Sequence, residues 1–140
     1  INPRLLNAWL DHLNGWAEVD SVCQSNFTAA EILNNWNGWR SLILKLSQEK
    51  NLNKKRASLV LLTNVVSKSP NKNLSRLAFQ LIDKLKGEKS ILITKAISWL
   101  LRALTYLHKK DVEKYLNKSR DTLPKIAVRE TERKLSTGRK

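Results

Sequence analysis

The sequence predicts an all-α protein, and three observations carry that prediction. Only four glycines and three prolines interrupt the 140 residues, so a helix meets few obligatory breaks. Apolar side chains recur three and four residues apart, which is the spacing of one face of a helix. Runs that alternate apolar and polar β-branched residues, the pattern typical of half-buried strands, are missing. We therefore expect helices joined by short links.

Turn-forming and capping residues set the expected helix boundaries along the chain. Gly15 ends the first helix, and the Ser25-Asn26-Phe27 step ends the second. Thr28 with Glu31 three residues later forms a capping-box pattern, which begins the third. Ser69-Pro70 and Gly87 separate the helices on either side of them. The full set is 3–14, 17–24, 29–48, 53–67, 73–85, 90–107, 110–117 and 123–135, the last capped by Asp121-Thr122 ahead of Leu123-Pro124.

The order of these helices indicates antiparallel pairs stacked into a short solenoid. Consecutive helices with short links lie beside each other, and each pair can cover the apolar face of its neighbour. A compact helical bundle is the alternative, because no sequence motif recurs at a fixed period. We expect residues 1–135 to form the helical domain and residues 136–140 a basic tail. Because the chain begins at Ile1 and contains no methionine, we expect the natural start of the protein to lie elsewhere.

Basic residues greatly outnumber acidic residues. Lysine and arginine total 26 against 12 aspartates and glutamates, for a formal net charge of +14. Such a surplus attracts polyanions and favours nucleic acid as the partner, whereas an acidic membrane surface or an ordinary solvated helix surface explains it less specifically. The single cysteine excludes an intrachain disulfide, and no apolar run approaches the roughly 20 residues of a membrane span. We expect a soluble, intracellular protein.

The segment from Lys95 to Arg102 has two distinct faces when it is wound at 100° per residue. A large aromatic ring among cations suits a surface on which the cations hold phosphates and the ring meets sugar or base. Coverage of Trp99 by a neighbouring helix is the alternative. The apolar face holds Ala96, Ile97, Leu100, Leu101 and Leu104, and the opposite face holds Lys95, Ser98, Trp99 and Arg102.

A second candidate lies near the start of the chain, where Trp16 and Asp20 are four residues apart and share a helix face. A carboxylate at the margin of an apolar, aromatic surface in a cationic protein can stabilise positive charge in a bound group. A helix cap or a surface salt bridge is the ordinary alternative for such an aspartate. Glu18 points the other way and reads as a surface charge.

Four sequence blocks, in order and across nearly the whole chain, resemble the AlkD-type DNA alkylation repair family. The third block is the most specific, and Ala17 departs from members that carry an acidic residue directly after the tryptophan. The blocks are Trp16-Ala17-Glu18-Val19-Asp20, Lys55-Arg56-Ala57-Ser58-Leu59-Val60, Lys95 to Arg102, and Val128-Arg129-Glu130.

This resemblance implies a fold and a reaction. The implied fold is a HEAT-like right-handed solenoid with a basic concave face that cradles duplex DNA. Members usually carry further helices ahead of the tryptophan–aspartate block, so the resemblance also implies that this chain is the C-terminal part of a longer fold. The implied reaction is hydrolysis of the N-glycosidic bond of cationic alkylated purines, such as 3-methyladenine and 7-methylguanine, without base flipping. Asp20 matches the catalytic carboxylate, Trp16 and Trp99 match two aromatics that contact the deoxyribose, and Arg56 matches an arginine that holds the DNA backbone. Lys95 and Arg102 are inferred as phosphate contacts from their helix face alone.

Other readings of the same residues remain open. A DNA-binding module without catalysis fits the same basic charge, and a protein-interaction scaffold would use Trp36, Trp39 and the apolar helix 53–67 as docking surfaces. We interpret these two tryptophans and Trp9 as core, because tryptophans three apart on one helix usually pack. His12 and His108 are isolated and read as surface or capping residues. We expect no metal, no cofactor and no obligate protein partner, and a monomer in the cytoplasm or, in a eukaryote, the nucleus.

Overall fold

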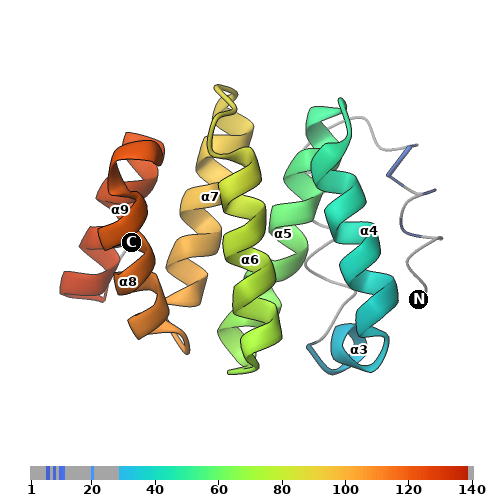
Figure 1. Ribbon diagram of the computed structural model, residues 1–140, viewed down its shortest axis with the longest axis horizontal. Coiled ribbons are helices and arrows are strands. Elements are labelled where there is room, and N and C mark those ends of the chain that lie inside the picture. The colour runs from blue at the N-terminus through green and yellow to red at the C-terminus, as the bar shows by residue number, and fades with distance from the viewer. Residues whose placement is uncertain (1–5, 7, 9, 12–19, 21–28, 139–140) are drawn as a thin grey trace.

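The computed structural model describes residues 6, 8, 10, 11, 20 and 29–138, and every regular element within them is a helix. The prediction of an all-α fold is confirmed for this part of the chain. Figure 1 shows the helices side by side in chain order. They are α3 (Ala29–Asn34), α4 (Trp36–Gln48), α5 (Leu52–Lys68), α6 (Lys72–Leu85), α7 (Ile91–Leu104), α8 (Lys109–Ser119), the 3-10 turn η1 (Arg120–Thr122) and α9 (Lys125–Thr137).

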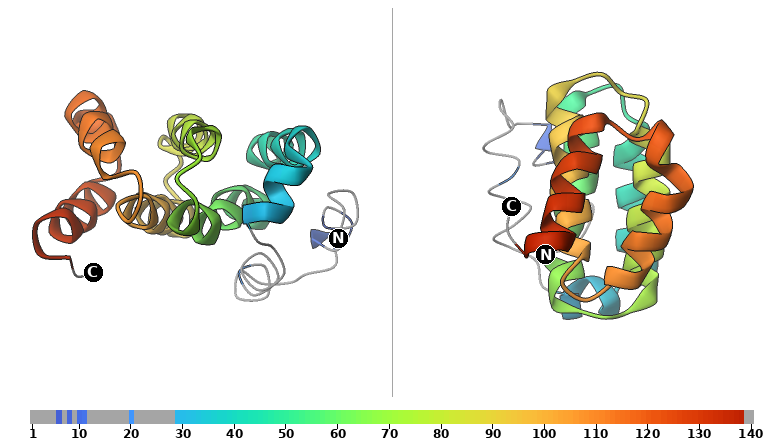
Figure 2. Two further views of the ribbon diagram at one scale, coloured as in Figure 1. Left: turned by 90° about the horizontal axis from the view of Figure 1, so that it is seen from below. Right: turned by 90° about the vertical axis from the view of Figure 1, so that its left-hand side faces the viewer.

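The long helices form two layers, which are seen end-on in Figure 2. One layer contains α4, α6 and α8, and the other contains α5, α7 and α9. Within the second layer α5 packs against α7 and α7 against α9, while α4 packs on α5. The expectation of stacked helices is confirmed. The curvature, handedness and basic concave face of a solenoid stay predictions.

A regular spacing runs through the stack although no sequence motif repeats. The helices α4, α6 and α8 begin at Trp36, Lys72 and Lys109, so successive helices of that layer start 36 or 37 residues apart. Side-chain contacts bridge similar separations: Lys86 donates to Thr122 across 36 residues, and Lys72 to Asp111 across 39. Equivalent positions of successive pairs are therefore neighbours in space. The repeat lies in helix length and packing, which is why residue identity did not reveal it.

The core lies between the two layers and is centred on α5. Nearly every residue of α5 from Lys54 to Val66 is buried, because α5 contacts α3, α4, α6 and α7 and so has neighbours on most sides. Trp39 of α4 is only 1% exposed, which confirms its expected place in the core, and the half-buried Trp36 packs against the same core. Trp9 lies outside the described residues.

Side-chain caps begin three of the helices. The side-chain oxygens of Asn51, Asn71 and Ser90 accept hydrogen bonds from backbone N–H groups in the first turns of α5, α6 and α7. The breaks predicted at Ser69-Pro70 and Gly87 are confirmed as the links on either side of α6. The predicted helices 3–14 and 17–24, the breaks at Gly15 and Ser25-Asn26-Phe27, and the Thr28 cap lie outside the continuously described residues.

The prediction of one continuous helix over 29–48 was wrong, because the chain breaks at Asn35 between α3 and α4. Asparagine disfavours helix interiors, since its side chain competes for backbone hydrogen bonds. The backbone here leaves the helical region, with Asn35 at φ −125° and ψ 51°. Gly38 accommodates the turn, because a Cβ atom at that position would lie 2.9 Å from the Asn35 side chain. The break separates α3 from α4, the helix whose buried residues include Trp39.

The expected cap at Asp121-Thr122 was also wrong. These residues form the end of η1, and α9 begins at Lys125 after Pro124. The Thr122 hydroxyl donates to the Ser119 carbonyl oxygen at 3.0 Å and accepts from Lys86 at 2.9 Å, so it is engaged away from the helix start.

Candidate active site and nucleic-acid interface

Asp20 is held in the structure by a two-point ion pair with Arg56 of α5. Arg56 Nε donates to Asp20 Oδ1 at 3.0 Å, and Nη2 donates to Oδ2 at 2.9 Å. The side chains of Asp20 and Arg56 are only 16% and 8% exposed. Two parallel bonds between a planar guanidinium and a carboxylate fix orientation as well as distance. The carboxylate is therefore aimed in one direction by the protein.

Arg56 is itself fixed to the next helix of its layer. Its third nitrogen, Nη1, donates to the carbonyl oxygen of Leu92 in the first turn of α7. Asp20, Arg56 and Leu92 follow one another at intervals of 36 residues. The pair thus ties the carboxylate to the seam between α5 and α7. All three guanidinium nitrogens of Arg56 are bonded within the protein, so its role in this structure is to position Asp20. A contact of Arg56 with a DNA backbone stays a prediction.

The three successive basic residues at the start of α5 each bind an acid from a different segment. These pairings anchor two residues that precede α3 to the body of the stack. The sequence block that contains Arg56 gave no sign of them, because the partners are distant in the chain. The pairs are Lys54 with Asp11 at 2.6 Å, Lys55 with Glu88, and Arg56 with Asp20.

Trp99 lies on α7 beside the cationic residues expected around it. It is half-buried, packs against the core, and lines a pocket together with Arg102. Lys95 is exposed one turn earlier on the same helix. Partial coverage by neighbouring helices and partial exposure therefore both apply to Trp99. The part of the ring that remains accessible, next to Arg102, is what an aromatic contact with a nucleotide requires.

Ser98 shares a helix face with Trp99 and Arg102, as the spacing predicts, but α9 covers this part of the face. Ser98 is fully buried, and its hydroxyl donates to Glu130 Oε1 of α9 at 2.6 Å. Helix periodicity places Ser98 beside Trp99 correctly, but it could not show that α9 packs over this part of α7. Arg102 Nε in turn donates to the Ser98 hydroxyl and carbonyl oxygens, both at 3.3 Å. Glu130, which belongs to the fourth sequence block, is thus a candidate for positioning Arg102 through Ser98.

Trp16, the second aromatic expected at the site, lies outside the described residues. The structure therefore brings together Asp20 with Arg56, and Trp99 with Arg102, while the arrangement of the two tryptophans stays a prediction. Lys95 has no ion-pair partner among the described residues. Its ammonium group is available to solvent or to a phosphate.

His108 was expected to be a surface or capping residue, but its side chain is neither exposed nor a cap. Its backbone does occupy the position before α8, but the ring is 2% exposed and makes no capping bond. His108 Nε2 instead lies 2.9 Å from the carbonyl oxygen of Ser69. The ring closes the contact between the α5–α6 link and the start of α8, which is a structural role.

The ion pair between Lys72 and Asp111 gives a pH-dependent contribution to stability. A hydrogen bond from Lys72, whose nitrogen lies 2.6 Å from the carboxylate, holds the pKa of Asp111 below its ordinary value of 3.8. A lowered carboxyl pKa contributes stability above the unfolded-state pKa, and that stability is lost as pH falls through the folded-state value.

We expect the Asp111→Asn variant to lose about 0.5 kcal/mol of unfolding free energy near neutral pH, because the pair is partly exposed. Urea unfolding of both proteins at neutral and at strongly acidic pH measures this. The difference between them should vanish in acid; a difference that persists unchanged would show that the pair does not cause it.

No helix among the described residues is long and apolar enough to cross a bilayer. Within the same residues, no group of three or more histidine, cysteine or acidic side chains is arranged to hold a metal ion.

The family model described as DNA alkylation repair enzyme matches residues 3–135, which includes all four blocks of the sequence analysis and almost the whole chain. A search of curated proteins found no match.

Proposed function

The chain belongs to the DNA alkylation repair enzyme family, and from that premise we propose that it is a DNA glycosylase that removes cationic alkylated purines from duplex DNA. The observation that carries the proposal is the two-point ion pair between Asp20 and Arg56. An aspartate whose only task was to cap a helix would need no arginine from a distant helix to aim it. The family supports a repair enzyme, and the fixed carboxylate supports the particular reaction.

Asp20 has the chemistry that this reaction needs. An alkylated purine such as 7-methylguanine already carries positive charge. When the bond from C1′ to the base nitrogen breaks, the bonding electron pair goes to the base, which therefore departs as a neutral molecule. The sugar develops oxocarbenium character, which a carboxylate stabilises. Water then adds to C1′ and releases one proton. Arg56 takes two of the roughly four lone-pair positions of the carboxylate, so the others can face the sugar and orient the water.

The layer of α5, α7 and α9 is the face that we propose for DNA. Lys95, Trp99 and Arg102 lie on α7, and the first turn of α7 accepts the hydrogen bond from Arg56. The cations of α7 and the Asp20 carboxylate therefore lie along the same contact between α5 and α7. The proposed arrangement is a right-handed HEAT-like solenoid whose concave side is basic and binds the duplex as a monomer. Cation–π contacts of Trp16 and Trp99 with the charged lesion and sugar would add about 0.5 to 2 kcal/mol each.

The charge of the lesion is the property that this mechanism selects. Recognition of a charged base from the backbone side needs no extrusion of the base into a pocket, so bulky cationic lesions should be accepted. A neutral base leaves as an anion unless an acid protonates it, and the proposed site supplies a carboxylate rather than an acid.

We therefore expect release of 7-methylguanine and 3-methyladenine from duplex DNA, and little or no release of uracil. The measurement is base release from matched duplexes that carry 7-methylguanine or uracil at the same position, under low-salt conditions. Excision of uracil as fast as 7-methylguanine would contradict the charge-based mechanism. Failure to release either base, with duplex binding retained, would leave a DNA-binding protein without glycosylase activity.

A further inference from the structure

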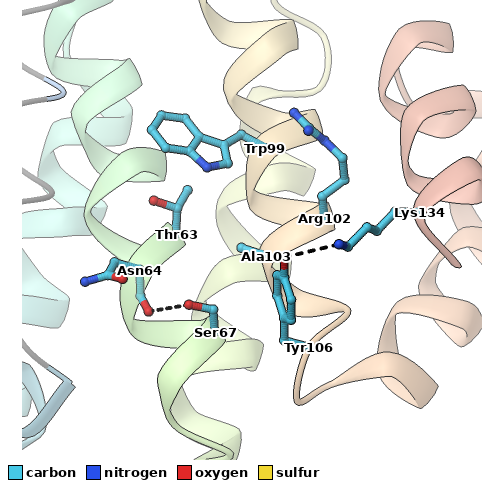
Figure 3. A pocket seen from close by; sticks show the side chains of 8 residues that line it. All are labelled: Thr63, Asn64, Ser67, Trp99, Arg102, Ala103, Tyr106 and Lys134. Atoms are coloured by element: carbon cyan, nitrogen blue, oxygen red, sulfur yellow. Dashed lines mark hydrogen bonds between the residues drawn. The ribbon is translucent and has the colours of Figure 1, made fainter. Parts of the chain in front are cut away.

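A pocket of about 220 Å³ lies beside the proposed DNA-contacting residues, between α5, α7 and α9. Figure 3 shows side chains from all three helices around it. Thr63 and Ser67 come from α5, Trp99 and Arg102 from α7, and Lys134 from α9, with Tyr106 following the end of α7.

The lining of this pocket fits an anion with an adjoining flat or apolar group. Arg102 and Lys134 contribute two positive charges, and no acidic side chain is among the lining residues. The hydroxyl groups of Thr63 and Ser67 donate to the carbonyl oxygens of Val60 and Asn64 in their own helix, so the two cations are the donors left for an anion. Phosphate is the anion that such cationic side chains bind in nucleic acids. The rings of Trp99 and Tyr106 supply the surface that a sugar or a base contacts.

Arg102 is held in a set position before any ligand arrives. Its Nε donates to the carbonyl and hydroxyl oxygens of Ser98, and the Ser98 hydroxyl donates to Glu130 at 2.6 Å. These bonds use one edge of the guanidinium. Among the described residues, Nη1 and Nη2 have no hydrogen-bond partner, so the outer edge can take a phosphate by two parallel bonds.

Lys134 and Tyr106 hold each other at the rim of the pocket, although they lie 28 residues apart. Lys134 Nζ donates to the Tyr106 hydroxyl oxygen at 3.1 Å and to the Gly138 carbonyl oxygen at 2.9 Å, and it lies 4.5 Å from the centre of the Tyr106 ring. Tyr106 is nevertheless 63% exposed. An exposed aromatic ring fixed by a cation from another helix is arranged to contact something outside the protein.

We propose that this pocket binds a backbone phosphate of the duplex next to the nucleotide that Trp99 contacts, with Arg102 and Lys134 as its cations and Tyr106 against the adjoining deoxyribose. The identity of the ligand as DNA rests on the proposed function. The pocket is displaced from Arg56 along α5, because Thr63 and Ser67 follow Arg56 by seven and eleven residues, or about 10 to 17 Å along the helix.

The test combines a Lys134→Gln variant with methylphosphonate substitution, which replaces one charged phosphate of the duplex by a neutral group. Binding to an undamaged duplex is measured over a range of salt concentrations, and then to a series of duplexes neutralised at single positions. Lys84→Gln is the control, because Lys84 is an exposed lysine of α6 in the opposite layer.

The expected result has two parts. The slope of log affinity against log salt becomes shallower by about 0.9 for Lys134→Gln and is unchanged for Lys84→Gln. In addition, one neutralised position weakens binding of the wild-type protein but not of Lys134→Gln, which is the signature of two groups that interact. If Lys134→Gln behaves like Lys84→Gln in both measurements, the inference is wrong.

The binding measurements separate this inference from the proposed reaction. Position-specific coupling without any base release would support the phosphate pocket and reject the glycosylase. Base release without coupling would support the glycosylase and reject the pocket. If the wild-type protein shows no salt-dependent duplex binding, both are rejected.

Discussion

The Asp20→Asn variant is expected to release 7-methylguanine about 10²- to 10³-fold more slowly than the wild-type protein, while its binding to duplex DNA is retained. The loss follows because a neutral amide cannot stabilise the developing positive charge of the sugar, and one electrostatic partner of a transition state has about this effect. Binding is retained because the change removes one negative charge from a protein of net charge +14. Base release under single-turnover conditions, with binding measured in parallel, checks both statements.

The matched control is Asp121→Asn, which makes the same charge change at an exposed residue of η1. It should release the base at the wild-type rate. Because asparagine presents an N–H group to Arg56 in place of one oxygen, thermal unfolding of Asp20→Asn is measured beside its activity. Wild-type release by Asp20→Asn would show that Asp20 is a structural partner of Arg56 and that another group performs the reaction.

Replacement of Arg56 by methionine is expected to lower the free energy of unfolding by about 3 to 5 kcal/mol, because it leaves one charge of a buried ion pair without its partner. Asp20 would lose both of its bonds from Arg56, and the Leu92 carbonyl oxygen would lose its bond from Nη1. Base release should fall as well, because the Asp20 carboxylate is no longer held in orientation by its two hydrogen bonds from Arg56. Urea unfolding followed by circular dichroism measures the stability.

A double variant separates the two consequences of this replacement. Asp20→Leu combined with Arg56→Met removes both charges and should recover much of the lost stability, because an apolar pair can replace a buried ion pair. It should remain inactive. Arg76→Met, at an exposed position of α6, is the control and should change stability by no more than about 0.5 kcal/mol. If Arg56→Met also lost no more than about 0.5 kcal/mol of stability, the ion pair between Asp20 and Arg56 would contribute little to the stability of the fold.

Local sequence patterns predicted the helix boundaries well where turn-forming residues mark the ends of the helices. Ser69-Pro70 and Gly87 stop helices by backbone chemistry, so they are visible in the sequence alone. The failures at Asn35 and Thr122 have a different cause. Asn35 interrupts a helix whose apolar spacing continues on both sides, and Thr122 finds a partner in Lys86, which lies 36 residues away.

The candidate site was predictable one helix at a time and not across helices. Periodicity placed Trp99 beside Arg102 and identified Asp20 as a residue at the edge of an apolar face. Periodicity could not show that Arg56 forms an ion pair with Asp20, or that Ser98 donates a hydrogen bond to Glu130. Those contacts depend on which helices become neighbours. The direction of a buried polar side chain is decided by packing, and packing is a property of the assembled stack.

The place of α8 and α9 at the end of the stack has a consequence for how the molecule opens. These two helices contact the rest of the described chain through α6 and α7, whereas α5 is enclosed by four helices. In stacked helix pairs the terminal unit can unfold at a lower free-energy cost than the interior. Amide protons of α9 should therefore exchange with solvent sooner than those of α5. Lys134 belongs to the terminal unit and Arg56 to the protected interior, so the proposed contact of Lys134 with DNA can open while Arg56 continues to hold the Asp20 carboxylate.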